Sequence, residues 1–207
     1  MLSDAIPVLI FGGPVYFSWG VKNGWSPIGN KKRVTKVSNN IVFELDGEPI
    51  LDFYNHYLGE YNKISSEYAL AVFEGNTDQF YLRSPAAGDA ANKSIAFFGD
   101  VPEGALVQLS ECTSAGIVEA TKEAMQLAIE NYNTDKPPSA ALIFSCATRK
   151  LLLGINTEKE FMIAKNSLPE SCVIFGFYTY GEIAPITKSE QSRFHNSTFT
   201  VVLIGES

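Results

Sequence analysis

The sequence predicts an α+β fold with mixed, largely antiparallel sheets and about three helices. Strand-like runs follow one another along the chain with few helices between them, whereas strict alternation would place a helix after every strand. Clusters of Gly, Asn, Asp and Pro separate these runs, as tight turns require. With 207 residues, 45% of them hydrophobic, the chain can bury a sizeable core.

The predicted strands are runs of apolar and β-branched residues without internal breaks. We expect the runs at 140–146 and 173–182 to be central in a sheet, because both are long, apolar and free of Pro. In chain order the predicted strands are Ile6–Phe11, Val15–Val21, Arg33–Val37, Ile41–Leu45, Tyr68–Phe73, Gln79–Arg83, Ile95–Gly99, Leu106–Cys112, Ala140–Cys146, Val173–Glu182 and Thr198–Ile204.

The predicted helices have recognisable starts and apolar stripes. Pro49 suits the first position of a helix that runs to Leu58. A Thr or Ser can cap a long helix that ends at about Asn133, and Pro137 and Pro138 then force an extended entry into the next strand. Leu151–Gly154 indicates the opening of a short helix. The predicted cap of the long helix is Thr113 or Ser114, and the predicted cap of the third helix is Asn156 or Thr157.

Charge and cysteine content exclude several classes of function. The 16 basic and 23 acidic residues give a net charge of −7, which argues against binding nucleic acid or an anionic membrane surface. The odd number of cysteines, each in or beside an apolar run, indicates a reducing compartment. The N-terminus lacks the basic segment of a signal peptide, and no apolar run reaches membrane-spanning length. We therefore expect a cytoplasmic protein.

One strand-like segment, Val173–Glu182, carries an unusual row of polar side chains. Alternation places Gly176, Tyr178, Tyr180 and Glu182 on one face, each about 6 to 7 Å from the next. Such a face could bind a polar small molecule, because the rings supply contact area while the hydroxyls and the carboxylate fix its orientation. A solvent-exposed strand face would give the same pattern.

A second candidate lies where the strand at 140–146 passes into a helix. Cys146 and Arg149 sit at this turn, where free backbone N–H groups and a guanidinium favour an anion. The alternative is a buried small side chain at Cys146 and a helix-surface cation at Arg149. Taken separately, each residue is better described by this alternative.

Together these segments resemble the C-terminal FIST domain, a sensory module of intracellular signal-transduction proteins. The motifs are FSCATRKLLLG, then Glu158 or Glu160, then GFYTYGEIAP and FHNST, in the order in which they stand here. Residues 45–207 would form that domain, and residues 1–44 are similar to the closing part of the N-terminal FIST domain. We expect residues before Asn40 to pack as an appendage. The resemblance implies a small ligand, commonly an amino acid, and a signalling partner.

The sequence therefore predicts a sensory module that binds an amino-acid-like metabolite, with no catalytic residues and no membrane or nucleic-acid partner. The predicted ligand-binding residues are Cys146, Arg149, Tyr178, Tyr180, Glu182 and His195. Metal ligation is poorly supported, because only two histidines are present and no metal-binding spacing occurs. Two alternatives stay open: a cysteine-dependent enzyme that uses Cys146 with His195 as its base, and a haem-based gas sensor in which His195 is the axial ligand.

Overall fold

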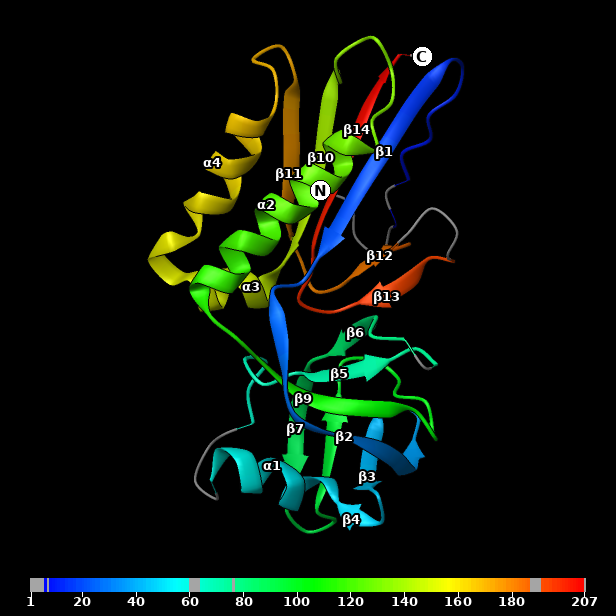
Figure 1. The fold of residues 1–207 in the computed structure, drawn as a ribbon, viewed down its shortest axis with the longest axis vertical. Coiled ribbons are helices and arrows are strands. Elements are labelled where there is room, and N and C mark those ends of the chain that lie inside the picture. Colours follow the sequence, from blue (N-terminus) through cyan, green and yellow to red (C-terminus); the bar gives the residue numbers. More distant parts are fainter. Residues whose placement is uncertain (1–5, 7, 60–63, 76, 187–190, 207) are drawn as a thin grey trace.

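Two lobes lie one above the other along the long axis of the molecule (Figure 1). The computed structural model describes residues 6, 8–59, 64–75, 77–186 and 191–206. One lobe, the helical lobe, is a four-stranded sheet with helices on one face, and the other, the sheet lobe, is an eight-stranded sheet with one helix. The predicted α+β class with mixed and largely antiparallel sheets is confirmed, and four α-helices occur in the described residues.

The helical lobe joins strands from both ends of the chain. Among the described strands of its sheet, β10 and β11 pair in parallel and the other neighbours are antiparallel. Small residues on α2 let the helix approach the sheet closely: a Cβ on Gly20 would lie 1.9 Å from the carbonyl oxygen of Ala124. The sheet order is β1 (Val15–Lys22), β14 (Phe199–Glu206), β10 (Ala140–Cys146) and β11 (Val173–Thr179), with α2 (Ser114–Glu130), α3 (Ala147–Leu153) and α4 (Glu158–Ser167).

The sheet lobe is built from the middle of the chain. Its core contains Ile50 and Tyr54 of α1 (Ile50–Leu58) against buried aliphatic residues of the sheet such as Val107 and Leu109. The strand order is β6 (Phe80–Arg83), β5 (Leu70–Phe73), β9 (Leu106–Cys112), β2 (Trp25–Ser38), β3 (Ile41–Leu45), β8 (Ser94–Phe97) and β7 (Pro85–Asp89), while β4 (Glu48–Pro49) pairs with β3.

The chain crosses between the lobes at short, hydrogen-bonded connections. β1 ends at Lys22 and β2 begins at Trp25, so two residues, Asn23 and Gly24, carry the chain from one lobe to the other. A two-stranded sheet of β12 (Glu182–Ala184) and β13 (Arg193–His195) lies beside the junction (Figure 1). From the sheet lobe, Arg83 Nη1 donates to the carbonyl oxygen of Phe194 at 3.1 Å, and the backbone N–H of Ser84 donates to Asn196 Oδ1 at 3.2 Å.

Three expectations about the strands are wrong. The strand at 173–182 is not central: β11 is at the edge of its sheet and ends at Thr179, because the following residues leave to pair with β13. Residues before Asn40 are no appendage, since β1 and β2 are integral to the two sheets. Ile6 and residues 8–11 belong to no strand, and Pro7 of that predicted strand lies outside the described residues.

Candidate functional site

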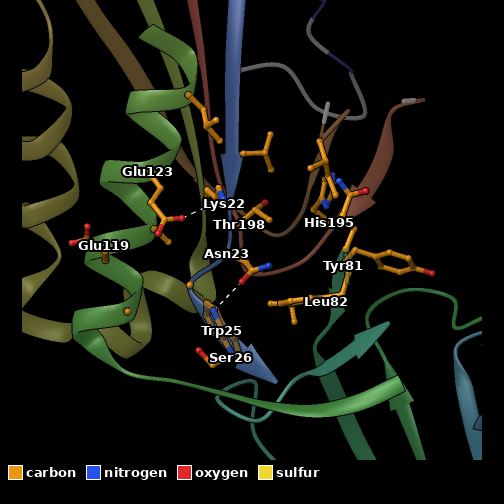
Figure 2. A pocket seen from close by; sticks show the side chains of 18 of the residues that line it. Lys22, Asn23, Trp25, Ser26, Tyr81, Leu82, Glu119, Glu123, His195 and Thr198 are labelled. Carbon is orange, nitrogen blue, oxygen red and sulfur yellow. Dashed lines mark hydrogen bonds and ion pairs between the residues drawn. The ribbon is translucent and has the colours of Figure 1, made fainter. Parts of the chain in front are cut away.

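A cleft of about 630 Å³ opens where the two lobes meet (Figure 2). Its walls come from the β1–β2 connection, from β6 and the residues before it, from one side of α2, and from the segment around β13. The cleft is thus an interdomain-type pocket, which is a common location for small-molecule sites. The lining residues are Val21–Ser26, Asp78–Leu82, Gly116, Glu119, Ala120, Glu123, Leu127, Ile186, His195 and Thr198.

The β1–β2 connection is shaped by Asn23 and Gly24. Gly24 has φ of 90°, a conformation that side chains other than Gly rarely adopt, and a Cβ there would lie 2.7 Å from the carbonyl oxygen of Gly116 on α2. Asn23 Oδ1 accepts a hydrogen bond from the backbone N–H of Trp25 at 2.8 Å. Figure 2 shows the other end of this amide directed towards the hollow of the cleft. The turn therefore holds one amide donor in place beside the cleft.

Charges of both signs stand at the cleft. Lys22 Nζ lies 3.3 Å from Glu123 Oε2, and both side chains are about half exposed, at 41% and 51%. This pair comes from two different elements, β1 and α2 (Figure 2). Leu82 of the sheet lobe and Ala120 and Leu127 of α2 supply apolar lining. The arrangement offers a cation, an anion and an apolar surface within one pocket.

His195 and Thr198 form the inner wall and are almost fully buried. His195 is 2% exposed, and its Nε2 lies 2.9 Å from the carbonyl oxygen of Ala184. Thr198 Oγ1 donates to Glu182 Oε2 at 2.7 Å, and the hydroxyl of Thr179 donates to the other oxygen of the same carboxylate. Burial raises the pKa of Glu182, and the hydrogen bonds from the two threonines oppose this shift. Glu182 thus lies behind the cleft wall, with both oxygens bound by the protein.

Arg149 occupies the centre of a buried polar network rather than an open anion site. Its side chain is 0% exposed, and its Nε donates to Glu160 Oε1 at 2.8 Å. Nη1 and Nη2 also donate to protein acceptors, and the fully buried guanidinium therefore presents no surface to a ligand in the cleft. These two nitrogens bind the carbonyl oxygen of Asn23, the carbonyl oxygen of Ile117 at 2.9 Å and the hydroxyl of Thr121 at 2.8 Å.

The predicted row of Tyr178, Tyr180 and Glu182 is broken. Tyr178 Oη donates to Glu160 Oε2 at 2.8 Å and so belongs to the Arg149 network, while Tyr180 is 92% exposed. The row fails because the chain turns away after Thr179, and period-2 alternation holds only within one strand. Tyr178 and Glu160 also border a smaller groove of about 330 Å³ between α4 and β11.

Cys146 is 4% exposed, and burial together with the nearby Glu182 carboxylate raises the pKa of its thiol. A catalytic cysteine requires the opposite shift, since the thiolate is the nucleophile. The residues present also do not fit a haem: the Nε2 of His195 is engaged by Ala184, and the ring is buried. Among the described residues, no three His, Cys, Asp or Glu side chains gather as a metal site.

The predicted site residues therefore do not converge on one cavity. Arg149 and Tyr178 meet at Glu160, Cys146 and Glu182 lie behind Thr198, and only His195 borders the cleft itself. Sequence reasoning missed Lys22, Asn23 and Glu123. The dipeptide Asn23-Gly24 is a turn signal in the sequence. No sequence pattern relates Lys22 to Glu123, because about a hundred residues separate them.

Comparisons with known proteins identify the family. The FIST C domain matches residues 51–185, and the FIST N domain matches residues 1–48. An uncharacterized protein of Methanocaldococcus jannaschii is 31% identical over 111 residues, which cover 52% of this chain and 22% of that protein, so the match spans about a fifth of that relative. No solved structure matches the chain. None of the helices in the described residues is long and apolar enough to cross a membrane. The chain belongs to the FIST family, whose domains are sensory modules of signal transduction.

Proposed function

We propose that this chain senses an amino-acid-like metabolite in the cleft between its lobes and passes the signal to a partner protein in the cytoplasm. The observation that carries this proposal is the presence of Lys22 and Glu123 at the rim of a cleft of about 630 Å³ with apolar lining. A zwitterion needs one partner of each charge and a surface for its side chain. The cleft size also lies in the usual range for small-ligand sites, roughly 300 to 1,000 Å³.

Each group of an amino acid has a counterpart in the cleft. The ligand's carboxylate would accept hydrogen bonds from Lys22 Nζ and from the amide of Asn23, and its ammonium would pair with Glu123. The apolar part of the ligand would rest against Leu82 and Leu127. These contacts are charge-assisted hydrogen bonds at a site that is half shielded from water, where they are stronger than at an open surface.

The lobes supply the route for a signal. A ligand in the cleft would touch Leu82 of the sheet lobe and Glu123 of the helical lobe at the same time. It would therefore favour one relative position of the lobes over others, and a partner that binds that position would read the occupancy. Asn23 is the residue through which the cleft meets the Arg149 network, because Arg149 Nη1 donates to its carbonyl oxygen.

No specific observation favours the enzyme or haem alternatives over this function. A buried Cys146 with a raised pKa lacks the thiolate that nucleophilic catalysis requires. The three cysteines are free in the structure, which supports the reducing compartment assumed in the proposal.

Isothermal titration of the purified chain with the twenty common amino acids tests the proposal. We expect at least one to bind with a dissociation constant below about 1 mM. Lys22→Met and Glu123→Gln should each weaken that binding at least about tenfold, since each removes a charge-assisted contact. The matched controls are Lys136→Met and Glu130→Gln, exposed residues outside the cleft, and they should leave the affinity unchanged. Binding of no amino acid, or equal effects of site and control variants, would refute it.

A further inference from the structure

In the part of the chain that the structure describes, no helix covers one face of the four-stranded sheet in the helical lobe, here called the bare sheet face. The helices pack on the other face, where Ser18 Oγ donates to the carbonyl oxygen of Ala128 on α2. Because side chains alternate along a strand, Phe17 next to Ser18 points to the opposite side. The same alternation and pairing register bring further apolar side chains to that side. The bare sheet face consists of Phe17, Leu142, Phe144, Val173, Phe175 and Phe177.

Large apolar side chains on the bare sheet face are strongly exposed to solvent. The exposed fractions are 59% for Phe17, 67% for Val173, 64% for Phe175 and 60% for Phe177. Single exposed apolar residues are ordinary, but a contiguous group of this kind marks an interaction surface. Figure 1 shows α2 and α4 together on one side of this sheet.

The rings on this face are already ordered against one another. Phe144 and Phe177 meet edge to face with centroids 5.4 Å apart, and Phe17 lies 6.1 Å from the ring of Trp19. Such rings form a firm surface at little further entropic cost, which favours specific packing over loose adhesion.

The strand sequences themselves indicate that both sheet faces are covered. β10 reads AALIFSC and β11 begins VIFGF, near-continuous apolar runs that are typical of strands buried on both sides. A sheet with one solvated face would instead alternate apolar and polar residues. The described helices cover one of these two faces.

We propose that the bare sheet face packs against the same face of a second copy of this chain, which makes a two-layered sheet sandwich at the centre of a homodimer. A two-fold axis makes such an interface self-complementary, so each ring layer meets an identical one. Sheets stacked face to face lie about 10 Å apart and interleave their side chains, as this ladder of Phe and Leu allows.

The area and charge of the face both suit a second copy. A Phe side chain carries roughly 150 to 250 Å², so the exposed fractions give roughly 600 to 800 Å² per copy when the half-buried neighbours are included. A stable interface needs about 800 Å² per partner. Each chain carries a net charge of −7, yet the side chains that alternate onto the face are uncharged up to Glu206 at the end of β14. Like-charge repulsion therefore does not prevent two copies from meeting there.

Sedimentation velocity of the purified chain over a dilution series up to about 100 μM tests the proposal. We expect a concentration-dependent monomer–dimer equilibrium. The double variant Phe175→Gln/Phe177→Gln should raise the dimer dissociation constant at least about tenfold, because central aromatic residues dominate interface energies. Both side chains are already more than half exposed, so apart from the loss of the contact between Phe144 and Phe177 the thermal unfolding midpoint of the monomer should change little.

The matched control is Phe98→Gln, another exposed aromatic residue at 58%, which belongs to the sheet lobe. It should leave the dimer constant unchanged. A monomer at every concentration would overturn the proposal and assign the face to a different polypeptide layer. A dimer that survives the double variant would overturn it as well. Because no residue of the cleft is altered, loss of the dimer with retained amino-acid binding separates this inference from the proposed function.

Discussion

Replacing Arg149 by Met should destabilise the protein strongly, because the guanidinium is a structural group. The substitution keeps an unbranched side chain of similar reach but removes the cation from the ion pair with Glu160. This pair is buried, since the side chain of Arg149 is 0% exposed and that of Glu160 is 4% exposed. It also removes the Arg149 donors to the carbonyl oxygens of Asn23 and Ile117, of which the latter keeps the hydroxyl of Thr121. Removing one partner of a buried ion pair costs about 3 to 5 kcal/mol of unfolding free energy.

The expected loss is large compared with total stability. A domain of this size is stable by about 5 to 15 kcal/mol, and each kcal/mol shifts the unfolding midpoint by about 2 to 4 °C, so the midpoint should fall by roughly 6 to 20 °C. Urea unfolding followed by circular dichroism gives the free energy, and Lys159→Met is the control. Lys159 neighbours Glu160 but is exposed, so its loss should change stability by less than about 0.5 kcal/mol.

A second substitution isolates the pair. In Arg149→Met/Glu160→Gln no buried charge is left unpaired, and the neutral amide still accepts from Tyr178 and Ser145. The double variant should therefore be more stable than the sum of the single losses predicts, with a coupling of at least about 1 kcal/mol. The reasoning is refuted if Arg149→Met unfolds within about 1 kcal/mol of the parent while it loses ligand binding, because the guanidinium would then serve recognition, as the sequence pattern suggested.

Two further predictions concern the junction. Burial raises the folded-state pKa of Glu182 above its ordinary value of 4.5, so the contribution of Glu182 to stability is present below that value and is lost as the pH rises through the folded pKa. In urea unfolding measured from about pH 4 to pH 8, Glu182→Gln should therefore flatten the fall of the unfolding free energy with pH. An unchanged pH profile would contradict this prediction. Gly24→Ala should cost at least about 1 kcal/mol more than Gly47→Ala, because both have positive φ but only the former would bring a Cβ against α2. Equal losses would mean that the connection does not pack against the helix.

Much of the fold could be predicted from local sequence patterns. The prediction failed where strand pairing depends on residues that are distant in the sequence. Strands such as Ile41–Leu45 and Leu106–Cys112 have the predicted bounds, since alternation and turn residues are local signals. The end of β11 is different: alternation continues through Tyr180 and Glu182, yet Glu182 pairs with His195 in another sheet. A Cβ on Gly181 would lie 2.3 Å from the ring of Phe194, so the close approach that redirects the chain depends on a residue well along the sequence.

Of the residues predicted for the site, only His195 lines the cleft, and most of the others belong to the buried networks behind it. Cys146, Arg149, Glu182 and His195 all prove to be buried at or near the junction, and sequence cannot show burial for polar residues because the partners are remote. Arg149 draws on Thr121 of α2 and Glu160 of α4. A cation at the start of a helix gives the same sequence pattern whether it faces solvent, a ligand or such a network.

The buried polar networks and the open cleft lie at the same junction between the lobes, and residues that line the cleft are hydrogen-bonded to the networks. Arg149 and Glu160 tie α2, α3 and α4 to the carbonyl oxygen of Asn23, while Thr198 and Thr179 hold Glu182 behind the cleft wall. A buried polar group that loses its partner is costly, so these networks permit few relative positions of the elements they join. Asn23, whose backbone carbonyl accepts from Arg149, and Thr198, whose hydroxyl donates to Glu182, both line the cleft. A ligand that binds them would therefore act on groups whose movement is coupled to several helices and both lobes, which is the property that a sensory module requires.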